Sequence, residues 1–188
     1  MKKLLLLGII ALFITSCTST NTPVVKAYGP GAVCLEGDCL SGQGKVKFPQ
    51  GLEYAGEFKD SRVDGKGLMM WPSGSKYDGE FNQNMRDGKG TYTYTNGDVY
   101  TGDFKNNKKH GQGEYKWKNG DVYVGEWADG LENGTGKYTW QEGVSYEGQW
   151  KDGKMNGTGT ITWPDSSRVK GIFENNRLVS EEKILFLN

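Results

Sequence analysis

The sequence predicts an all-β protein: a single-layer antiparallel β-meander repeat array of six 23-residue β-hairpin units, elongated and curved. One observation is a Tyr-x-Gly-(Glu/Asp/Gln)-(Phe/Trp) segment that returns every 23 residues. A second is a Gly-x-Gly motif with the same period, and a third is that both segments alternate with period two. A fixed period of this length marks a repeat architecture, and period-two alternation favours strands. Helices are excluded because each glycine would cost about 1 kcal/mol relative to alanine.

The N-terminus predicts export. Two lysines precede an apolar run over residues 4–14, which is shorter than the roughly 20 residues that a membrane-spanning helix needs. This order is typical of a secretory signal peptide. The segment Ile14-Thr15-Ser16-Cys17 resembles a bacterial lipobox, which implies removal of residues 1–16 and lipid attachment at Cys17. The alternative is an ordinary signal peptide with a nearby cysteine.

Residue Thr18, which follows the lipobox cysteine and is not acidic, resembles lipoproteins sent to the outer membrane. Several acyl chains together hold a protein stably on a membrane. Residues 17–30 contain small residues and prolines without a period, so we expect a flexible tether there. The expected location is therefore the cell envelope, with the chain lipid-anchored at the outer membrane.

Two kinds of turn connect the expected strands. Triplets such as Pro72-Ser73-Gly74 end in glycine, which fits a three-residue hairpin loop with a left-handed third residue. Longer six-residue loops, such as Asn82–Asp87, are expected at the other ends of the strands. Counting outwards from both turns gives one register. The predicted pairs are Phe81 with Gly88 and Gly65, Gly79 with Gly90 and Gly67, Tyr77 with Tyr92 and Met69, Glu57 with Lys66, and Glu80 with Lys89.

The two recurring motifs together resemble the MORN repeat (membrane occupation and recognition nexus), here in a chain of bacterial lipoprotein type. The resemblance covers residues 31–173 and implies β-hairpins stacked side by side into an elongated sheet of about twelve strands, about 55 Å long at about 4.8 Å per strand. The family includes scaffolds, membrane-tied proteins and accessory regions of enzymes such as plant phosphatidylinositol phosphate kinases. This chain has no room for a kinase domain.

Both ends of the array depart from the repeat and resemble capping units. The first unit has Gly31-Ala32-Val33-Cys34-Leu35 in place of the tyrosine segment. Residues 174–188 are expected to form a tail that caps the last strand, with a short helix as one form of the cap and a protein-binding tail as the alternative.

Cysteine usage favours a disulfide between Cys34 and Cys39, because the two residues bracket a turn in an exported chain. Reduced thiols are the alternative. A metal site is not expected, since the chain has one histidine, His110, and no further suitable cysteine. No cofactor is expected either.

A strip of aromatic side chains is the strongest candidate binding surface, because a one-layer sheet encodes no second layer to cover it. The strip comprises Trp71, Tyr77, Tyr92, Tyr94, Tyr100, Tyr115, Trp117, Tyr123, Tyr138, Trp140 and Trp163. Such rings suit peptides, partner proteins or glycans, and they also pack on one another and on glycine.

Charged residues carry no clear catalytic signal. The column Glu57, Glu80, Asp103 and Glu126 recurs in four successive units, whereas a catalytic pair is normally unique. Basic loop residues are diluted by aspartates in the same loops, so solvated loops are favoured over a lipid-binding edge; they are Arg62, Arg86, Lys108, Lys109 and Lys154. Zero net charge gives no reason to expect a nucleic-acid partner.

The expected function is therefore that of a non-enzymatic, lipid-anchored envelope scaffold that binds a partner protein. The alternative is direct binding of membrane phospholipid or envelope glycan through the aromatic strip and the loops.

Overall fold

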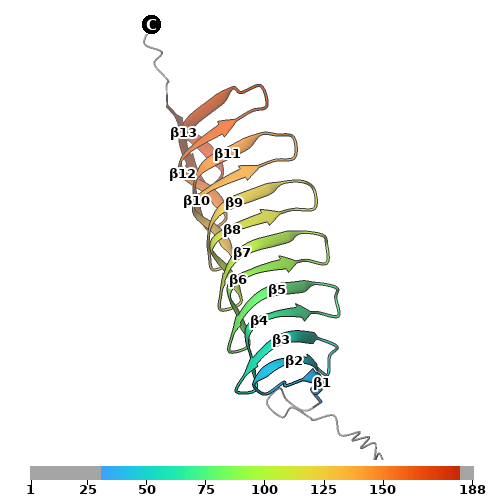
Figure 1. Ribbon diagram of the computed structural model, residues 1–188. Helices are drawn as coiled ribbons and strands as arrows, with labels where there is room; N and C mark the ends of the chain where they lie inside the picture. The colour runs from blue at the N-terminus through green and yellow to red at the C-terminus, as the bar shows by residue number, and fades with distance from the viewer. Residues whose placement is uncertain (1–30, 183–188) are drawn as a thin grey trace, which may run out of the picture.

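The computed structural model describes residues 31–182, which form one open antiparallel sheet (Figure 1). The predicted signal peptide, the predicted lipidation residue Cys17 and the predicted tether lie outside the described residues. Fourteen strands follow one another in chain order. They are β1 (Val33–Gly37), β2 (Gly42–Lys47), β3 (Glu53–Lys59), β4 (Arg62–Met70), β5 (Lys76–Asn82), β6 (Met85–Thr93), β7 (Val99–Lys105), β8 (Lys108–Lys116), β9 (Val122–Ala128), β10 (Leu131–Thr139), β11 (Ser145–Lys151), β12 (Lys154–Thr162), β13 (Arg168–Glu174) and β14 (Arg177–Glu181).

This architecture confirms the predicted fold class. Each strand pairs only with its neighbours in sequence, so the sheet is a meander, and Figure 1 shows it as an elongated array. The strand count exceeds the predicted twelve because the repeat region up to Glu174 holds thirteen strands and the C-terminal segment adds one more. Its described part forms β14, which pairs with β13, so a helical cap over this part was wrong. Within residues 31–182, no helix is long and apolar enough to cross a membrane.

The predicted register is confirmed at the centre of each strand. Gly79 pairs with Gly67 and Gly90, and Tyr77 pairs with Met69 and Tyr92. The glycine-ended triplets are also confirmed as turns. In the turn after β4, for example, the Gly74 amide donates to the Trp71 carbonyl at 2.9 Å and Gly74 has φ 92°.

The predicted six-residue loop was wrong. Strands β5 and β6 continue to a two-residue turn, Gln83-Asn84, in which both residues have positive φ, 48° and 70°. Asparagine tolerates this conformation better than most residues. A bulge after Gly79 absorbs the extra residues, so Phe81 pairs with Arg86 instead of Gly88.

The same bulge changes the ionic pairs. Lys66 lies opposite Glu80, and Lys89 lies opposite Asp103 with an Nζ–Oδ1 distance of 2.8 Å. The predicted pairs of Glu57 with Lys66 and of Glu80 with Lys89 were therefore wrong. They were wrong because the bulge removes Glu57 and Glu80 from pairing with the following strand, while each still pairs with the preceding strand.

Glycine makes room for fully buried tyrosines in a sheet one layer thick. A Cβ atom added to Gly90 would lie 2.5 Å from the Cζ atom of Tyr77, so the ring lies directly on the glycine backbone. The Tyr77 hydroxyl donates to the Glu80 carbonyl at 3.0 Å. The same hydroxyl bond recurs at Tyr54, Tyr100, Tyr123 and Tyr146.

These tyrosines form the core together with the Phe or Trp that ends each motif. Each tyrosine ring contacts the Phe or Trp of its own unit and that of the next unit edge to face, at centroid distances from 4.9 to 5.3 Å. Edge-to-face geometry is favourable for aromatic pairs. The core is thus one continuous ladder of rings along the array.

The N-terminal hairpin is closed covalently. Cys34 and Cys39 are joined in a disulfide, with S–S 2.10 Å and Cα–Cα 6.0 Å, and both side chains are buried. The bond links β1 to the turn before β2, where the unit lacks the tyrosine segment.

Candidate binding face

The predicted aromatic strip divides into buried and accessible rings. Tyr77, Tyr100 and Tyr123 are fully buried in the ladder, and Tyr115 is 8% exposed. The accessible members are half-buried or exposed, and they are Trp71, Tyr92, Tyr94, Trp117, Tyr138, Trp140 and Trp163. These rings, together with Tyr115, are called the aromatic row below.

The aromatic row is a continuous stack between Trp71 and Trp140. Successive ring centroids lie 4.4 to 5.7 Å apart with tilted planes. The stack forms because each unit places two rings close together. A tyrosine occupies the last inward position of β6, β8 and β10, and a second aromatic residue, two positions later, begins the following turn. Within residues 31–182, no second layer covers the row.

Two buried aspartates fix the orientation of tyrosines in this row. Asp98 accepts a hydrogen bond from the Tyr115 hydroxyl at 2.8 Å, and Asp121 accepts one from the Tyr138 hydroxyl at 2.7 Å. Burial opposes ionisation of Asp98, but hydrogen bonds from the Lys118 amide, Asn96 and Tyr115 outweigh it and lower the pKa of the carboxyl. Burial, together with the hydrogen bonds to the aspartates, raises the pKa values of the Tyr115 and Tyr138 hydroxyls above their usual range.

Basic side chains also lie on this face. Arg86 and Lys109 were predicted to lie in loops, but the tight turns place them on β6 and β8, opposite Phe81 and Phe104. Glu132 holds the equivalent position on β10, opposite Trp127. These three charged residues are spaced 23 residues apart, and the equivalent residues in the flanking units are apolar. This spacing was the signal that sequence reasoning missed.

The strands bend toward the aromatic face. Arg86 and Tyr92 are six residues apart on β6, about 20 Å in a straight strand. The Arg86 guanidinium nevertheless lies 5.0 Å from the Tyr92 ring centroid and 5.9 Å from that of Trp71. Lys109 and Tyr115 repeat this contact on β8, at 4.4 Å. The face is therefore folded so that the charged side chains lie over the rings.

Lys109 is a partly desolvated cation. Its Nζ lies 3.8 Å from the Trp127 ring centroid. Burial lowers the pKa of the amine to about 8, against the opposing effect of the Glu132 and Asp98 carboxylates. The other basic residues that were predicted in loops are exposed, namely Arg62, Lys108 and Lys154.

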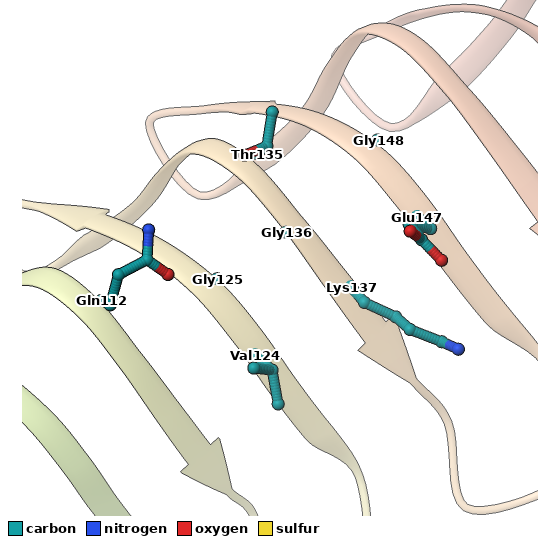
Figure 2. A pocket seen from close by; sticks show the side chains of 8 residues that line it. All are labelled: Gln112, Val124, Gly125, Thr135, Gly136, Lys137, Glu147 and Gly148. Atoms are coloured by element: carbon teal, nitrogen blue, oxygen red, sulfur yellow. The ribbon is translucent and has the colours of Figure 1, made fainter.

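The opposite face of the sheet carries polar and charged side chains. Figure 2 shows one of its shallow hollows, about 470 Å³, where Gln112, Val124 and Lys137 surround glycine backbone. Similar hollows recur on other units, as expected of a repeat. The acidic column has structural contacts here: Glu126, for example, accepts a hydrogen bond from the Thr135 amide at 2.9 Å.

His110 lies on β8, where it pairs with Asp103 at the edge of the bulge. Among residues 31–182, no group of three or more His, Cys, Asp or Glu side chains is arranged to hold a metal ion.

A solved structure with the same fold has low sequence identity to this chain. The TCP domain of SAS-4 (dCPAP) of Drosophila melanogaster, in complex with a proline-rich motif of Ana2 (dSTIL), superposes with a TM-score of 0.50 at 12% identity. The match covers 92% of this chain and 86% of that chain. The TCP10 domain of Danio rerio CPAP gives a TM-score of 0.44 at 11% identity and covers 76% and 68%.

Comparison with curated proteins gives no match. The family model of the MORN repeat matches five consecutive segments, 54–76, 77–99, 100–122, 123–145 and 146–168. These segments are adjacent, make up more than half of the chain and coincide with the hairpins from β3 to β12. The chain therefore belongs to the MORN repeat family.

Proposed function

We propose that this protein is a non-enzymatic, lipid-anchored scaffold of the bacterial cell envelope, which binds an extended segment of a partner protein along the aromatic row. The observation that carries the proposal is the continuous stack of rings, most of them accessible, which no second layer covers within residues 31–182. Large accessible aromatic surfaces are typical of binding sites.

An extended peptide fits the repeat distance of the array. Each unit contributes two strands, so equivalent residues in adjacent units lie about 9.6 Å apart. Three residues of a polyproline II segment span about 9.3 Å. One residue in three would therefore meet the same position of each successive unit. A proline-rich motif bound to a protein of similar fold supports this choice.

Lipid attachment at Cys17 would place this surface at the membrane. The support is the order of basic start, apolar run and lipobox-like end in residues 1–17. Mass spectrometry of the N-terminal peptide tests it: an acylated Cys17 is expected, and Cys17→Ser should release the protein from the membrane fraction. An unmodified N-terminus at any other residue would contradict lipid attachment.

Crosslinking in intact envelopes tests partner binding. A stoichiometric crosslinked partner is expected, and it should be lost when Trp117 and Trp140 are replaced by alanine. Val124→Ala on the opposite face, where Val124 is 50% exposed, is the matched control and should keep the partner. A partner that survives the double tryptophan substitution would refute the aromatic row as the binding surface.

The second candidate function is binding of anionic phospholipid or glycan on the same face. The presence of Arg86 and Lys109 favours phospholipid, at about 1 kcal/mol per charge near a membrane surface, and the accessible rings suit sugars. A chain that lacks residues 1–17 should then sediment with anionic liposomes. If it stays in the supernatant, lipid binding by the array is excluded.

A further inference from the structure

Three charged side chains interrupt the otherwise apolar line that runs beside the ring ladder. The line has one residue per unit, namely the second residue of the strand that follows each tight turn. It begins with Val63, continues with Arg86, Lys109 and Glu132, and returns to an apolar side chain at Met155. The centre of the binding face is therefore charged, in the order cation, cation, anion.

The two cations have no carboxylate partner among the described residues. Ion pairs in this part of the chain involve other lysines. Arg86 donates to the Asn107 carbonyl at 2.7 Å, and its Nε has a long contact of 3.5 Å with Asn107 Oδ1. Lys109 Nζ has no hydrogen-bond acceptor in residues 31–182 and instead lies against rings.

A desolvated ammonium group without an acceptor is costly to fold. The repeat shows that this cost is not imposed by the architecture, because Met155 occupies the equivalent position two units later. Cations that face rings and have no carboxylate in direct contact within residues 31–182 are ready to receive one, since charge-assisted hydrogen bonds are the strongest that the side chains make.

We infer that Arg86, Lys109 and Glu132 select the sequence and the direction of the bound segment: an acidic residue meets Arg86, a second acidic residue three positions away meets Lys109, and a basic residue three positions further meets Glu132. The inference rests on the proposed peptide-binding function. The partner is thus an extended, proline-rich segment with charges at every third residue.

The spacing follows from the array. Adjacent units are about 9.6 Å apart, so successive recognised residues are about three residues apart in an extended chain. Running the same segment in the opposite direction places a basic residue beside Arg86 and an acidic one beside Glu132. Like charges then oppose each other at two of three positions, which sets the direction of binding.

Binding is linked to protonation of Lys109. The groups that face its amine are Glu132 on β10, Asp98 before β7, and the rings of Tyr100, Tyr115 and Trp127. Burial lowers the amine pKa to about 8 in the free protein. A bound carboxylate favours the protonated amine and raises this pKa, so affinity is full below pH 8 and falls as the pH rises through 8.

The test uses fluorescence anisotropy with the full chain in detergent and synthetic polyproline peptides. One labelled peptide carries two glutamates and one lysine at every third residue, a second carries the same residues in reversed order, and a third is uncharged. We expect the first to bind about tenfold more tightly than either of the others. Equal affinity for the forward and reversed peptides would overturn the inference.

Variants of Lys109 supply the matched controls. Lys109→Gln should weaken binding of the forward peptide about tenfold, whereas Lys108→Gln, which removes an exposed lysine paired with Asp129 at 3.0 Å, should leave it unchanged. Lys109→Arg should retain binding and abolish its loss above pH 8, because arginine stays charged. Loss of affinity in Lys109→Arg across the same pH range would contradict the linkage.

A charge exchange separates recognition from folding. Lys109→Glu should lose the forward peptide and gain a peptide in which the middle glutamate is replaced by lysine. A variant that binds neither peptide while keeping wild-type circular dichroism would refute the inference.

The outcomes also separate this inference from the proposed function. If the uncharged peptide binds as tightly as the charged one, the aromatic row binds peptides but the charges select nothing. If no peptide binds and anionic vesicles bind in a Lys109-dependent way, the cations serve lipid headgroups, and both the peptide selection and the proposed function fail.

Discussion

Replacing Lys109 by methionine should stabilise the protein. The amine lies among the rings of Tyr115 and Trp127 without an acceptor in residues 31–182, so the folded state carries a desolvated charge. Methionine has a similar length and keeps the packing of the stem. It is also the residue found at the equivalent position, Met155, so the site accepts it.

The size of the effect follows from the amine pKa. A fall in the amine pKa from the ordinary value of 10.5 to about 8 corresponds to about 3.5 kcal/mol at 1.4 kcal/mol per tenfold change. Because Lys109 is only half-buried, solvent reduces this to roughly 1–2 kcal/mol. The folded-state pKa lies below the unfolded one, so the cost is fully present below pH 8 and vanishes as the pH rises towards 10.5.

Urea unfolding followed by circular dichroism at pH 7 and pH 10 measures this difference. We expect Lys109→Met to raise the unfolding midpoint at pH 7 and to lose most of that gain at pH 10. Lys108→Met, at the exposed neighbouring position, should change the midpoint little at either pH. A destabilised Lys109→Met protein at pH 7, or a gain that is the same at both pH values, would refute the reasoning.

Three further predictions concern the fold. Gly90→Ala should cost about 1–3 kcal/mol in urea unfolding, because the added methyl overlaps the hydroxyl and ring of the fully buried Tyr77; a neutral result would show that the ring can move. Asp121→Ala should lower the thermal midpoint at pH 7 but not at pH 2, since the carboxyl pKa is lowered in the folded state and its stabilisation disappears on protonation; equal losses at both pH values would contradict this. Replacing both Cys34 and Cys39 by serine should lower the free energy of unfolding by about 2 kcal/mol. Dithiothreitol should then no longer change hydrogen exchange in the N-terminal hairpin, whereas an effect that persists would contradict this.

The central register was predictable from the sequence because two motifs share one period. Counting from the glycine-ended turns placed Gly67 opposite Gly79, and the structure has that pair. The tight turns were not predictable by counting alone, since their two residues, such as Asn106-Asn107, require left-handed backbone that competes with a longer loop. Asparagine in these turns was the available signal.

The candidate site was only partly predictable. The sequence placed the rings on one face but did not say which would be buried. Tyr100 is covered because it lies on a glycine pair, whereas Tyr94 follows the last inward position and stays half-buried. Arg86 and Lys109 were misplaced because an error in the loop length moved them off the strands.

The most direct test of the aromatic row as the binding surface is site-specific photocrosslinking in intact cells. A photoreactive phenylalanine analogue replaces Tyr94 in the row, and the same analogue replaces Val124 on the opposite face. We expect position 94 to crosslink to one envelope protein through a proline-rich segment, and position 124 to give no such product. A protein crosslink from position 124 with none from position 94 would contradict the proposal.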